Sequence, residues 1–458
     1  SAASDVYKRQ GDFSMFRVYA SKDNRPAAYS PQNVPYRPKK HFSISTKGVK
    51  EGDFTMIYGF PGNTQEYILS DAVAYIAERS DPAKIAVRTG RLDIITKAQE
   101  SDPALRIHYA AKHASIANAW KKWQGEALGI DRRGTVAAKF DYETQFGLWS
   151  VGRPEYAGVV MGLRAEYDRI MDAYFAYEIT RETLSTLPAA YTPEERAEEC
   201  FARRKFAEQA LWRHAFREYG RCPKVYRTPS YAEGMARYKS PEAYADALFE
   251  AVWEGSDSVA MQPAVRLREE TKRMLDHISW MLGTKSLRNL NSKILNELYT
   301  TYIKGLREWD RERAFYPDAN LTLRVAYGSV AGYEYADGEY HKPQTTLDGI
   351  IAKDNPEIYD YDIPQSLRDL YASKNYGRWG TVIDGRRTVP VCFLATNHTT
   401  GGNSGSPVLN AGGELIGINF DRTWRSTMSD IAFDPAICRN IAVDIRYCLL
   451  YTSPSPRD

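Results

Sequence analysis

The chain has 458 residues, of which 61 are lysine or arginine and 58 are aspartate or glutamate, so its formal net charge is +3. This near balance does not indicate nucleic acid as a partner, and no apolar run is long enough to span a membrane. The length is sufficient for two or three domains. Five cysteines without a Cys-Xaa-Xaa-Cys pair predict neither a zinc site nor a disulfide framework. The sequence implies no metal and no cofactor.

The two ends of the chain differ from the rest. Residues 1–10 run into Gly11 without a turn or a cap, and residues 448–458 break off a strand-like apolar run at 441–445. Both ends resemble translated adapter sequence at the ends of sequenced fragments. We therefore expect residues 1–10 and 448–458 to be non-native and the chain to be an internal fragment, and they do not enter the prediction of the fold.

Short runs that are rich in aromatic and β-branched residues, with turn-forming residues between them, predict strands near both ends of the remaining chain. They are residues 12–19, 41–46, 54–60, 321–330, 381–384 and 389–394.

Between Thr64 and about Phe315 the apolar residues recur three and four positions apart, which predicts helices. Residues 192–195, Thr-Pro-Glu-Glu, have the sequence of a capping box, and Ser240-Pro241-Glu242 repeats its first part. We therefore expect an α+β chain in which a large all-α domain is inserted into an all-β domain. The expected boundaries are 11–63 and 319–447 for the β domain and 64–318 for the helical domain.

Residues 399–410, Thr-Thr-Gly-Gly-Asn-Ser-Gly-Ser-Pro-Val-Leu-Asn, form the most informative motif. Glycines on both sides of Ser404 allow a tight turn and a close approach of a ligand, and they let the amides of Gly402 and Ser404 converge on an oxyanion. Ser404 is therefore the candidate nucleophile for acyl transfer. The segments 408–410 and 414–420, joined by a Gly-Gly turn, predict a β-hairpin after it.

The motif has two other interpretations. The nucleophile elbow of an α/β-hydrolase needs a helix after the serine, whereas here Ser406 replaces the second glycine and a hairpin follows. A glycine-rich hairpin loop can also carry serines for turn chemistry alone. The longer context, with the strand Gly-Glu-Leu-Ile-Gly-Ile after the loop, resembles the nucleophile loop of chymotrypsin-fold serine peptidases.

A serine peptidase also needs a base and a carboxylate that orients it. Asp12 stands at the head of an apolar run, as the orienting carboxylate does in chymotrypsin-fold peptidases, and its rival Asp53 is more simply a turn residue. The histidine precedes the aspartate in that fold, and no histidine precedes Asp12. His41 follows it, and His398 lies on the approach to the Ser404 loop. We therefore expect the catalytic histidine to lie outside this chain and the chain to be inactive by itself.

Five segments of the chain carry a family resemblance: residues 11–19, 59–62, 117–123, 345–349 and 401–407. Together they resemble the bacterial dipeptidyl-peptidase 7 and dipeptidyl-peptidase 11 family, and the resemblance is collinear from Gly11 to about Tyr447. It implies a chymotrypsin-type double β-barrel, partial here, with an inserted helical domain. It also implies a serine exopeptidase of the bacterial periplasm or cell surface, a homodimer when complete, that releases dipeptides from peptides with a free N-terminus.

The resemblance assigns roles to individual residues. Ser404 is the nucleophile, Asp12 is the orienting acid, and the amides of Gly402 and Ser404 form the oxyanion hole. Asn118, from the helical domain, helps to hold the α-amino group of the substrate. The family's other amine-binding residues, an Asn, a Trp and an Arg, have no counterpart in residues 6–10.

Asp421 and Arg422 end the strand at 416–420, where the strand beside the S1 pocket lies in chymotrypsin-type folds. In the family an arginine here marks the branch that prefers Asp or Glu at P1, because a guanidinium matches a carboxylate in a bidentate way. Asp421 would join the amine-binding group. From the residues alone, the two can also be a hairpin-tip pair that is solvated or bridged to itself. The expected function is a serine dipeptidyl peptidase selective for Asp or Glu at P1. The alternatives are apolar P1 selectivity and a non-catalytic peptide-binding protein on a peptidase fold.

Overall fold

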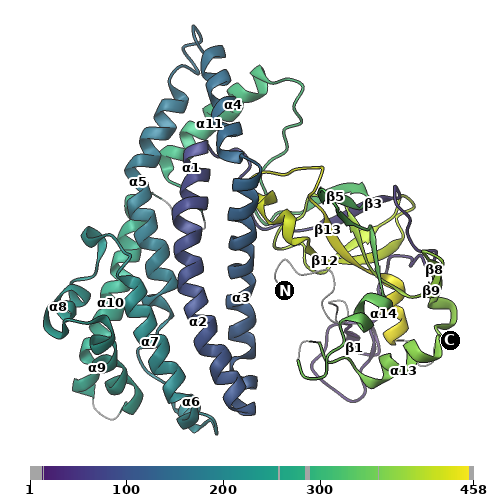
Figure 1. Cartoon of the computed structure of the whole chain (residues 1–458), viewed down its shortest axis with the longest axis horizontal. Coiled ribbons are helices and arrows are strands. Elements are labelled where there is room, and N and C mark those ends of the chain that lie inside the picture. Colours follow the sequence, from purple (N-terminus) through teal and green to yellow (C-terminus); the bar gives the residue numbers. More distant parts are fainter. Residues whose placement is uncertain (1–12, 14, 256–257, 284–288, 359–360, 453–458) are drawn as a thin grey trace. The chain divides into compact units, whose positions relative to one another are not determined.

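The computed structural model describes residues 13, 15–255, 258–283, 289–358 and 361–452 (Figure 1). The chain divides into two compact units. Within the described residues, a β-rich unit comprises the chain up to Glu66 and from Asp318 onward, and a helical unit comprises residues 67–317. The β-rich unit is therefore made of two stretches that the helical unit separates in sequence.

A seven-stranded antiparallel sheet forms the centre of the β-rich unit, in the order β4-β3-β11-β12-β13-β10-β7. Every residue of β10 and of β13 is buried, as expected for strands that are covered on both faces. The strands are β3 (Phe54–Gly59), β4 (Arg324–Ser329), β7 (Gln344–Thr346), β10 (Pro390–Ala395), β11 (Ser406–Leu409), β12 (Leu415–Arg422) and β13 (Asn440–Asp444).

The sheet curls until the end of β4 meets β10. Val330 forms an antiparallel bridge with Ala395. Next to it, the Thr396 amide donates a hydrogen bond of 2.9 Å to the Ser329 carbonyl oxygen. The curled sheet encloses one apolar core of fully buried side chains: Val49, Ile57, Val330, Phe393, Val408, Ile416 and Ala442.

Smaller elements surround this sheet, and α14 packs against β10, β12 and β13. The expected boundary between residues 447 and 448 falls inside α14, in which Tyr447 and Cys448 are buried. The smaller elements are the strand pairs β1 (Tyr19–Ala20) with β2 (Val34–Pro35), β5 (Tyr333–Ala336) with β6 (Glu339–His341) and β8 (Thr381–Ile383) with β9 (Arg386–Thr388), and the helices α12 (Leu347–Ala352), α13 (Gln365–Ser373) and α14 (Ile445–Thr452).

Two of the expected strands hardly form. In the described part of residues 12–19, strand structure is limited to Tyr19, and in residues 41–46 it is limited to one bridge between Ile44 and Leu415. Both segments are largely exposed, Phe16 at 89%. β-Branched and aromatic residues favour a strand only where a neighbouring strand and a packing surface are available, and these segments have little of either.

The helical unit holds long helices, and α2 and α3 pack beside each other (Figure 1). A π-helical turn, Ile76–Ser80, separates α1 from α2. No helix among the described residues is long and apolar enough to cross a membrane. The helices are α1 (Ser70–Tyr75), α2 (Asp81–Ser101), α3 (Pro103–Arg132), α4 (Thr135–Trp149), α5 (Val159–Glu182), α6 (Pro193–Ala197), α7 (Lys205–Tyr219), α8 (Pro229–Tyr238), α9 (Pro241–Glu254), α10 (Ser258–Met281) and α11 (Lys293–Trp309).

The capping box predicted for α6 is confirmed. The Glu195 amide donates to the Thr192 hydroxyl at 3.2 Å, and the Thr192 amide donates to the Glu195 carboxylate at 2.7 Å. Ser240 caps α9 with the first of these two contacts alone, because its hydroxyl accepts from the Ala243 amide at 3.2 Å. These contacts satisfy amides at the helix starts that have no partner within the helix.

Candidate active site

Ser404 lies on the loop between β10 and β11, in the β-rich unit. Its side chain is exposed, and its hydroxyl donates a hydrogen bond of 3.2 Å to the Phe420 carbonyl oxygen at the end of β12. Within the described chain this is its one side-chain hydrogen bond, and no histidine contacts it. The serine is therefore presented to solvent beside β12, and none of the described residues places a base next to it.

The loop takes a backbone shape that requires glycine at Gly402. Its φ is +108°, a region that other residues rarely adopt. A Cβ there would lie 2.3 Å from the Phe60 carbonyl oxygen and 2.9 Å from the Gly62 nitrogen. The Gly59-Phe60-Pro61-Gly62 segment that follows β3 thus packs directly against the nucleophile loop.

The amides of the loop divide into two groups. Those of Asn403, Gly405 and Ser406 donate to the carbonyl oxygens of Thr400, Asn419 and Asn403, at 3.1, 2.8 and 3.0 Å. Among the described residues, the amides of Gly402 and Ser404 have no backbone partner. These two are the donors that the sequence predicts for the oxyanion hole, and their hydrogen-bonding capacity is unused within the described part of the chain.

Three buried asparagines support the Ser404 loop through hydrogen bonds. The Asn419 side-chain amide donates to the Asn403 carbonyl oxygen at 3.1 Å, and the Asn440 side-chain amide donates to the Asn419 side-chain oxygen at 2.9 Å. The Asn403 side chain is 3% exposed and accepts from the Thr400 amide. Asn419 and Asn440 were not among the residues that the sequence suggested. The available signal was an asparagine inside each of two apolar strands, where a buried amide needs partners.

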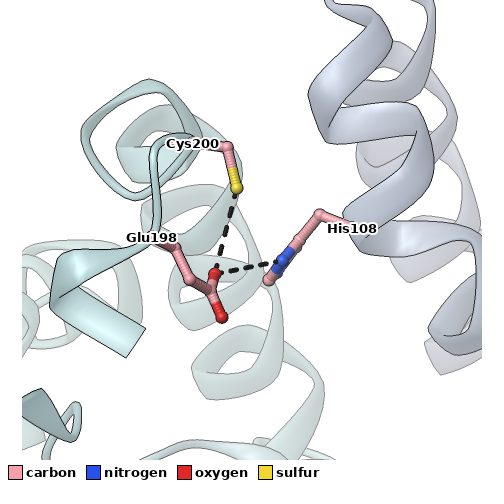
Figure 2. Close-up of side chains that lie close together, drawn as sticks. All are labelled: His108, Glu198 and Cys200. Atoms are coloured by element: carbon pink, nitrogen blue, oxygen red, sulfur yellow. Dashed lines mark hydrogen bonds and ion pairs between the residues drawn. The ribbon is translucent and has the colours of Figure 1, made fainter. Parts of the chain in front are cut away.

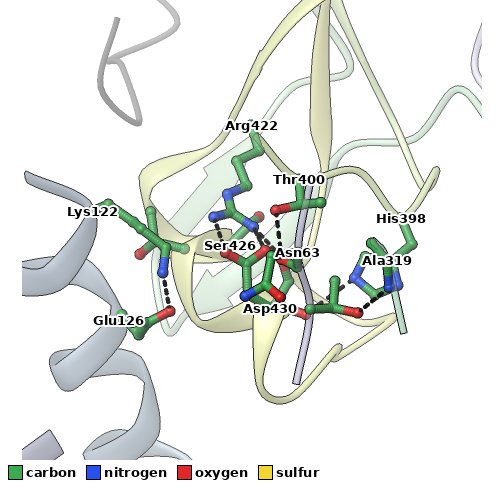
Figure 3. Close-up of polar contacts among 12 residues, drawn as sticks. Asn63, Lys122, Glu126, Ala319, His398, Thr400, Arg422, Ser426 and Asp430 are labelled. Carbon is green, nitrogen blue, oxygen red and sulfur yellow. Dashed lines mark hydrogen bonds and ion pairs between the residues drawn. The ribbon is translucent and has the colours of Figure 1, made fainter. Parts of the chain in front are cut away.

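Arg422, the last residue of β12, is held by a carboxylate from its own unit. Its Nη1 and Nη2 donate to the two oxygens of Asp430 at 2.5 and 2.9 Å (Figure 3). Nη1 also donates to the Ser429 hydroxyl at 2.8 Å. The Arg422 side chain is 11% exposed and that of Asp430 is 10% exposed. The solvated surface pair considered for Arg422 is therefore not what the structure shows. Asp430 was not among the residues that the sequence suggested.

The ring of His398, the histidine nearest to Ser404 in sequence, contacts residues other than Ser404. Its Nε2 donates to the Ser429 carbonyl oxygen at 3.1 Å, and its ring stacks on Phe433. Its Nδ1 lies 3.4 Å from a carboxylate oxygen of Glu66. Burial lowers the pKa of His398, and the nearby Arg422 lowers it further, although Asp430 and the Ser429 carbonyl oppose this shift.

The remaining predicted residues lie in different places. Asp12 is outside the described residues. The Asp53 carboxylate accepts a hydrogen bond from the Lys50 amide at 2.7 Å, which is a turn contact. The Asp421 carboxylate accepts one from the Arg422 amide at 2.8 Å. Asn118 is an exposed residue of α3 in the helical unit.

The turns of α3 that carry Asn118 are fixed to the neighbouring helix α2. The Trp120 indole nitrogen donates to the Thr89 hydroxyl at 2.9 Å. The Trp123 ring lies beneath two cations of α2, with Lys84 Nζ at 4.4 Å and the Arg88 guanidinium at 4.5 Å from its centroid. Residues 117–123 therefore pack along the contact between α2 and α3. Within α3, Lys122 and Glu126 form an ion pair of 2.6 Å (Figure 3).

One group of side chains in the helical unit has the chemistry of metal ligands (Figure 2). His108 Nδ1 lies 3.4 Å from a Glu198 carboxylate oxygen, and the Cys200 sulfur lies 3.9 Å from the same oxygen. Arg204 Nη1 is 2.7 Å from His108 Nε2 and 3.2 Å from that Glu198 oxygen. Burial lowers the pKa of His108, and Arg204 lowers it further. The guanidinium already supplies a positive charge to this group, so the group does not fit a metal ion well.

The family description Peptidase S46 matches residues 7–208 and 192–453, and thus nearly the whole chain. The chain belongs to the peptidase S46 family. Curated relatives include an Asp/Glu-specific dipeptidyl-peptidase of Capnocytophaga gingivalis, 38% identical over 96% of this chain, and one of Porphyromonas gingivalis, 34% identical over 97%. A dipeptidyl-peptidase 7 of Phocaeicola vulgatus is 32% identical over 96%. The alignments cover 67%, 66% and 66% of these relatives, so the chain spans about two thirds of their length.

Solved structures of the family agree with this assignment. The crystal structure of Porphyromonas endodontalis DPP11 in complex with the dipeptide Arg-Glu matches with a TM-score of 0.81 and 31% identity, over 97% of this chain and 69% of that one. The same protein in complex with the dipeptide Arg-Asp matches with a TM-score of 0.81 and 30% identity, over the same shares of both chains. The predicted relationship to the dipeptidyl-peptidase 7 and 11 family is confirmed, and so is the predicted mixed architecture of helices and sheet.

Proposed function

We propose that this chain is part of a serine dipeptidyl peptidase that releases N-terminal dipeptides and prefers Asp or Glu at P1. The Ser404 loop is the observation that carries this proposal. It presents an exposed hydroxyl next to two amides that have no backbone partner among the described residues, and it does so in a member of a family whose relatives are named dipeptidyl peptidases.

In the proposed reaction, the Ser404 hydroxyl oxygen attacks the carbonyl carbon of the second peptide bond while the catalytic base takes the hydroxyl proton, and the protonated base then serves as the general acid. The amides of Gly402 and Ser404 donate to the oxyanion that forms. The tetrahedral intermediate collapses to an acyl-enzyme when the leaving amine takes a proton from the general acid. Water then attacks the ester, and the dipeptide leaves with a free carboxylate. Asp12 would orient the base, and Asn118 with Asp421 would hold the substrate's α-amino group.

The proposal assigns the base to a histidine outside this chain. Three histidines lie in the β-rich unit, and each has its ring directed elsewhere: His41 to the Phe42 carbonyl oxygen, His341 to Glu339 and His398 to the Ser429 carbonyl oxygen. A hydroxyl without an adjacent base is a weak nucleophile. We therefore expect no turnover from this chain alone.

The curled sheet would be one barrel of a chymotrypsin-type double barrel. In this proposal residues 11–63 and 319–447 belong to the peptidase domain, and residues 64–318 are its helical insertion. The enzyme would be a homodimer in the bacterial periplasm or at the cell surface. The contact between the Gly59–Gly62 segment and the Ser404 loop supports the assignment of both β stretches to one domain.

The test uses the chain completed by its native upstream sequence. Release of dipeptide from Xaa-Asp and Xaa-Leu reporters is measured for the unmodified enzyme, Ser404→Ala and Arg422→Gly. We expect Ser404→Ala to lose about 10⁴-fold or more in kcat, and Arg422→Gly to shift the preference from Asp toward Leu. Activity that survives Ser404→Ala would refute the assigned nucleophile. A faster Xaa-Leu reaction of the unmodified enzyme would instead indicate the apolar-P1 alternative.

Labelling of the completed chain with a fluorophosphonate separates an enzyme from a non-catalytic peptide-binding protein. The reagent forms a covalent bond to an activated serine, so the completed chain should be labelled and Ser404→Ala should not. Peptide binding without labelling would support the non-catalytic alternative.

A further inference from the structure

We propose that Asp430 determines specificity by positioning Arg422. A neutral P1 side chain then contacts a guanidinium group that cannot move away from it. This inference rests on the proposed function, in which Arg422 faces the P1 side chain. It adds that acidic selectivity depends on a second residue, which comes from the segment after β12. Asp430 itself would not touch the substrate.

The contact between the two side chains has the geometry of a fixed pair. Two nearly parallel hydrogen bonds, at 2.5 and 2.9 Å, join the Arg422 guanidinium to the Asp430 carboxylate (Figure 3). Bidentate pairs of this kind fix the orientation of the guanidinium as well as its position. The Ser429 hydroxyl accepts a further hydrogen bond from Nη1 at 2.8 Å. Both charged side chains are about nine-tenths buried.

The backbone that carries Asp430 is held from several sides. Asp430 ends the 3₁₀ segment Trp424–Asp430. Its carbonyl oxygen accepts a hydrogen bond of 2.6 Å from the Gln65 amide, and the neighbouring Ser429 carbonyl oxygen accepts one of 3.1 Å from His398 Nε2. The Ser426 hydroxyl accepts from the Arg439 amide at 2.8 Å. Asp430 is therefore attached to the residues after β3, to the loop before Ser404 and to the start of β13.

The effect on specificity follows from the cost of breaking the pair. If Arg422 moved out to solvent, the buried Asp430 carboxylate would lose its bidentate contact, and removing one member of a buried ion pair is strongly unfavourable. The guanidinium therefore stays in place whichever side chain occupies P1. A neutral or apolar P1 residue must then pack against a cation, whereas an acidic one can pair with it. Selectivity of this kind comes from rejection of the wrong ligand as much as from attraction of the right one.

A change at Asp430 therefore has a distinctive consequence. Asp430→Asn keeps the size of the side chain and removes its charge, so withdrawal of Arg422 no longer leaves a buried carboxylate behind. Neutral ligands should then bind better, while acidic ligands should bind no better than before. A variant that is merely misfolded would lose both ligands, so a gain for the neutral one reports on specificity and not on folding.

The experiment measures binding of two dipeptides of equal size, Arg-Glu and Arg-Gln, to the full chain by calorimetry. We expect the unmodified chain to prefer Arg-Glu, and Asp430→Asn to reduce the ratio of the two affinities by about tenfold through tighter Arg-Gln binding. Ser429→Ala is the matched control, because it removes the neighbouring hydrogen bond and keeps the charge pair, and its ratio should stay within about twofold of the unmodified value.

The outcomes separate this inference from the proposed function. If Arg422→Gly abolishes the preference and Asp430→Asn keeps it, Asp430 has no positioning role and the proposed function stands. If the unmodified chain shows no preference for Arg-Glu, the proposed acidic selectivity fails, and this inference fails with it. Should Asp430→Asn not fold, Asp430→Glu takes its place, because its longer side chain cannot keep both contacts. Its ratio should fall by about threefold, and an unchanged ratio would overturn the inference.

Discussion

The Gly62 amide donates a hydrogen bond of 2.6 Å to the carbonyl oxygen of Gly401. The helical unit separates the two glycines in sequence, yet both belong to the β-rich unit. This contact joins the segment after β3 to the loop that presents Ser404. The Phe60 carbonyl oxygen, from the same segment, closes against Gly402. The shape of the nucleophile loop thus depends on residues on both sides of the helical unit in the sequence.

Gly402→Ala should disturb this loop. The new Cβ would lie 2.3 Å from the Phe60 carbonyl oxygen, and the backbone φ of +108° is strained for alanine. The loop must shift, and we expect a loss of about 2 kcal/mol in the free energy of unfolding. Urea denaturation measures this loss. In the chain completed by its upstream sequence, the rate of Ser404 labelling by a fluorophosphonate should fall as well.

Gly401→Ala is the matched control for this change. A Cβ at Gly401 meets no atom within 4 Å, and Gly401 is not among the glycines with a positive φ. Its stability should stay within about 0.5 kcal/mol of the unmodified chain. Equal losses from both substitutions would show that the close approach of Phe60 does not constrain the loop.

Asn419→Leu should destabilise the β-rich unit through its asparagine network. Asn419 is 2% exposed, accepts from the Asn440 side chain and donates to the Asn403 carbonyl oxygen. Leucine leaves one buried donor and one buried acceptor without this partner, at a cost of about 2 kcal/mol or more. The midpoint of urea denaturation reports the loss. Asn320→Leu changes an exposed asparagine of the same unit, and a similar loss there would argue against burial as the cause.

The sequence was most informative where the local pattern decides the structure. Apolar alternation located β3, β4, β10 and the hairpin of β11 and β12 to within a few residues. The capping box at Thr192 was also correct, because its contacts span only three residues. The segments 12–19 and 41–46 have the composition of strands but not the partners, and partners are a property of the whole fold.

In the candidate site, too, the local pattern predicts some features, whereas others depend on the whole fold. The Gly-Asn-Ser-Gly motif predicts a tight loop with available amides, and the structure has one. The pairing of Arg422 with Asp430 depends on the path of the chain after β12, so no local pattern predicts it. Neither does a pattern show that the Phe60 carbonyl oxygen approaches Gly402, because the two residues are far apart in sequence. The assignment of Asp12 and Asn118 to the site stays a prediction.

The helical unit contains a carboxyl group that should make stability depend on pH. Asp81, the first residue of α2, is fully buried and follows the π-helical turn. Lys84 Nζ lies 3.0 Å from one of its oxygens and 3.2 Å from a Glu178 oxygen. Burial raises the pKa of Asp81 from 3.8 to about 7, since the nearby Lys84 only partly offsets the desolvation of the carboxylate.

The raised pKa of Asp81 determines whether stability rises or falls with pH. Below pH 4 the carboxyl group is protonated in both the folded and the unfolded chain. Between about pH 4 and pH 7 the unfolded chain releases the proton first, so stability falls as the pH rises. One proton sets a maximum slope of about 1.4 kcal/mol per pH unit. Above about pH 7 both states are ionised, and this contribution no longer changes.

Asp81→Asn should remove this part of the pH dependence, because the amide does not titrate. We expect the midpoint of urea denaturation between pH 5 and pH 7 to vary less in Asp81→Asn than in the unmodified chain, and the two curves to separate mainly below pH 7. Asp93→Asn changes an exposed aspartate of the same helix and is the matched control, and an equal change of its profile would argue against burial as the cause. If Asp81→Asn and the unmodified chain gave parallel profiles from pH 4.5 to pH 8, the buried carboxyl group would not be the source of the dependence.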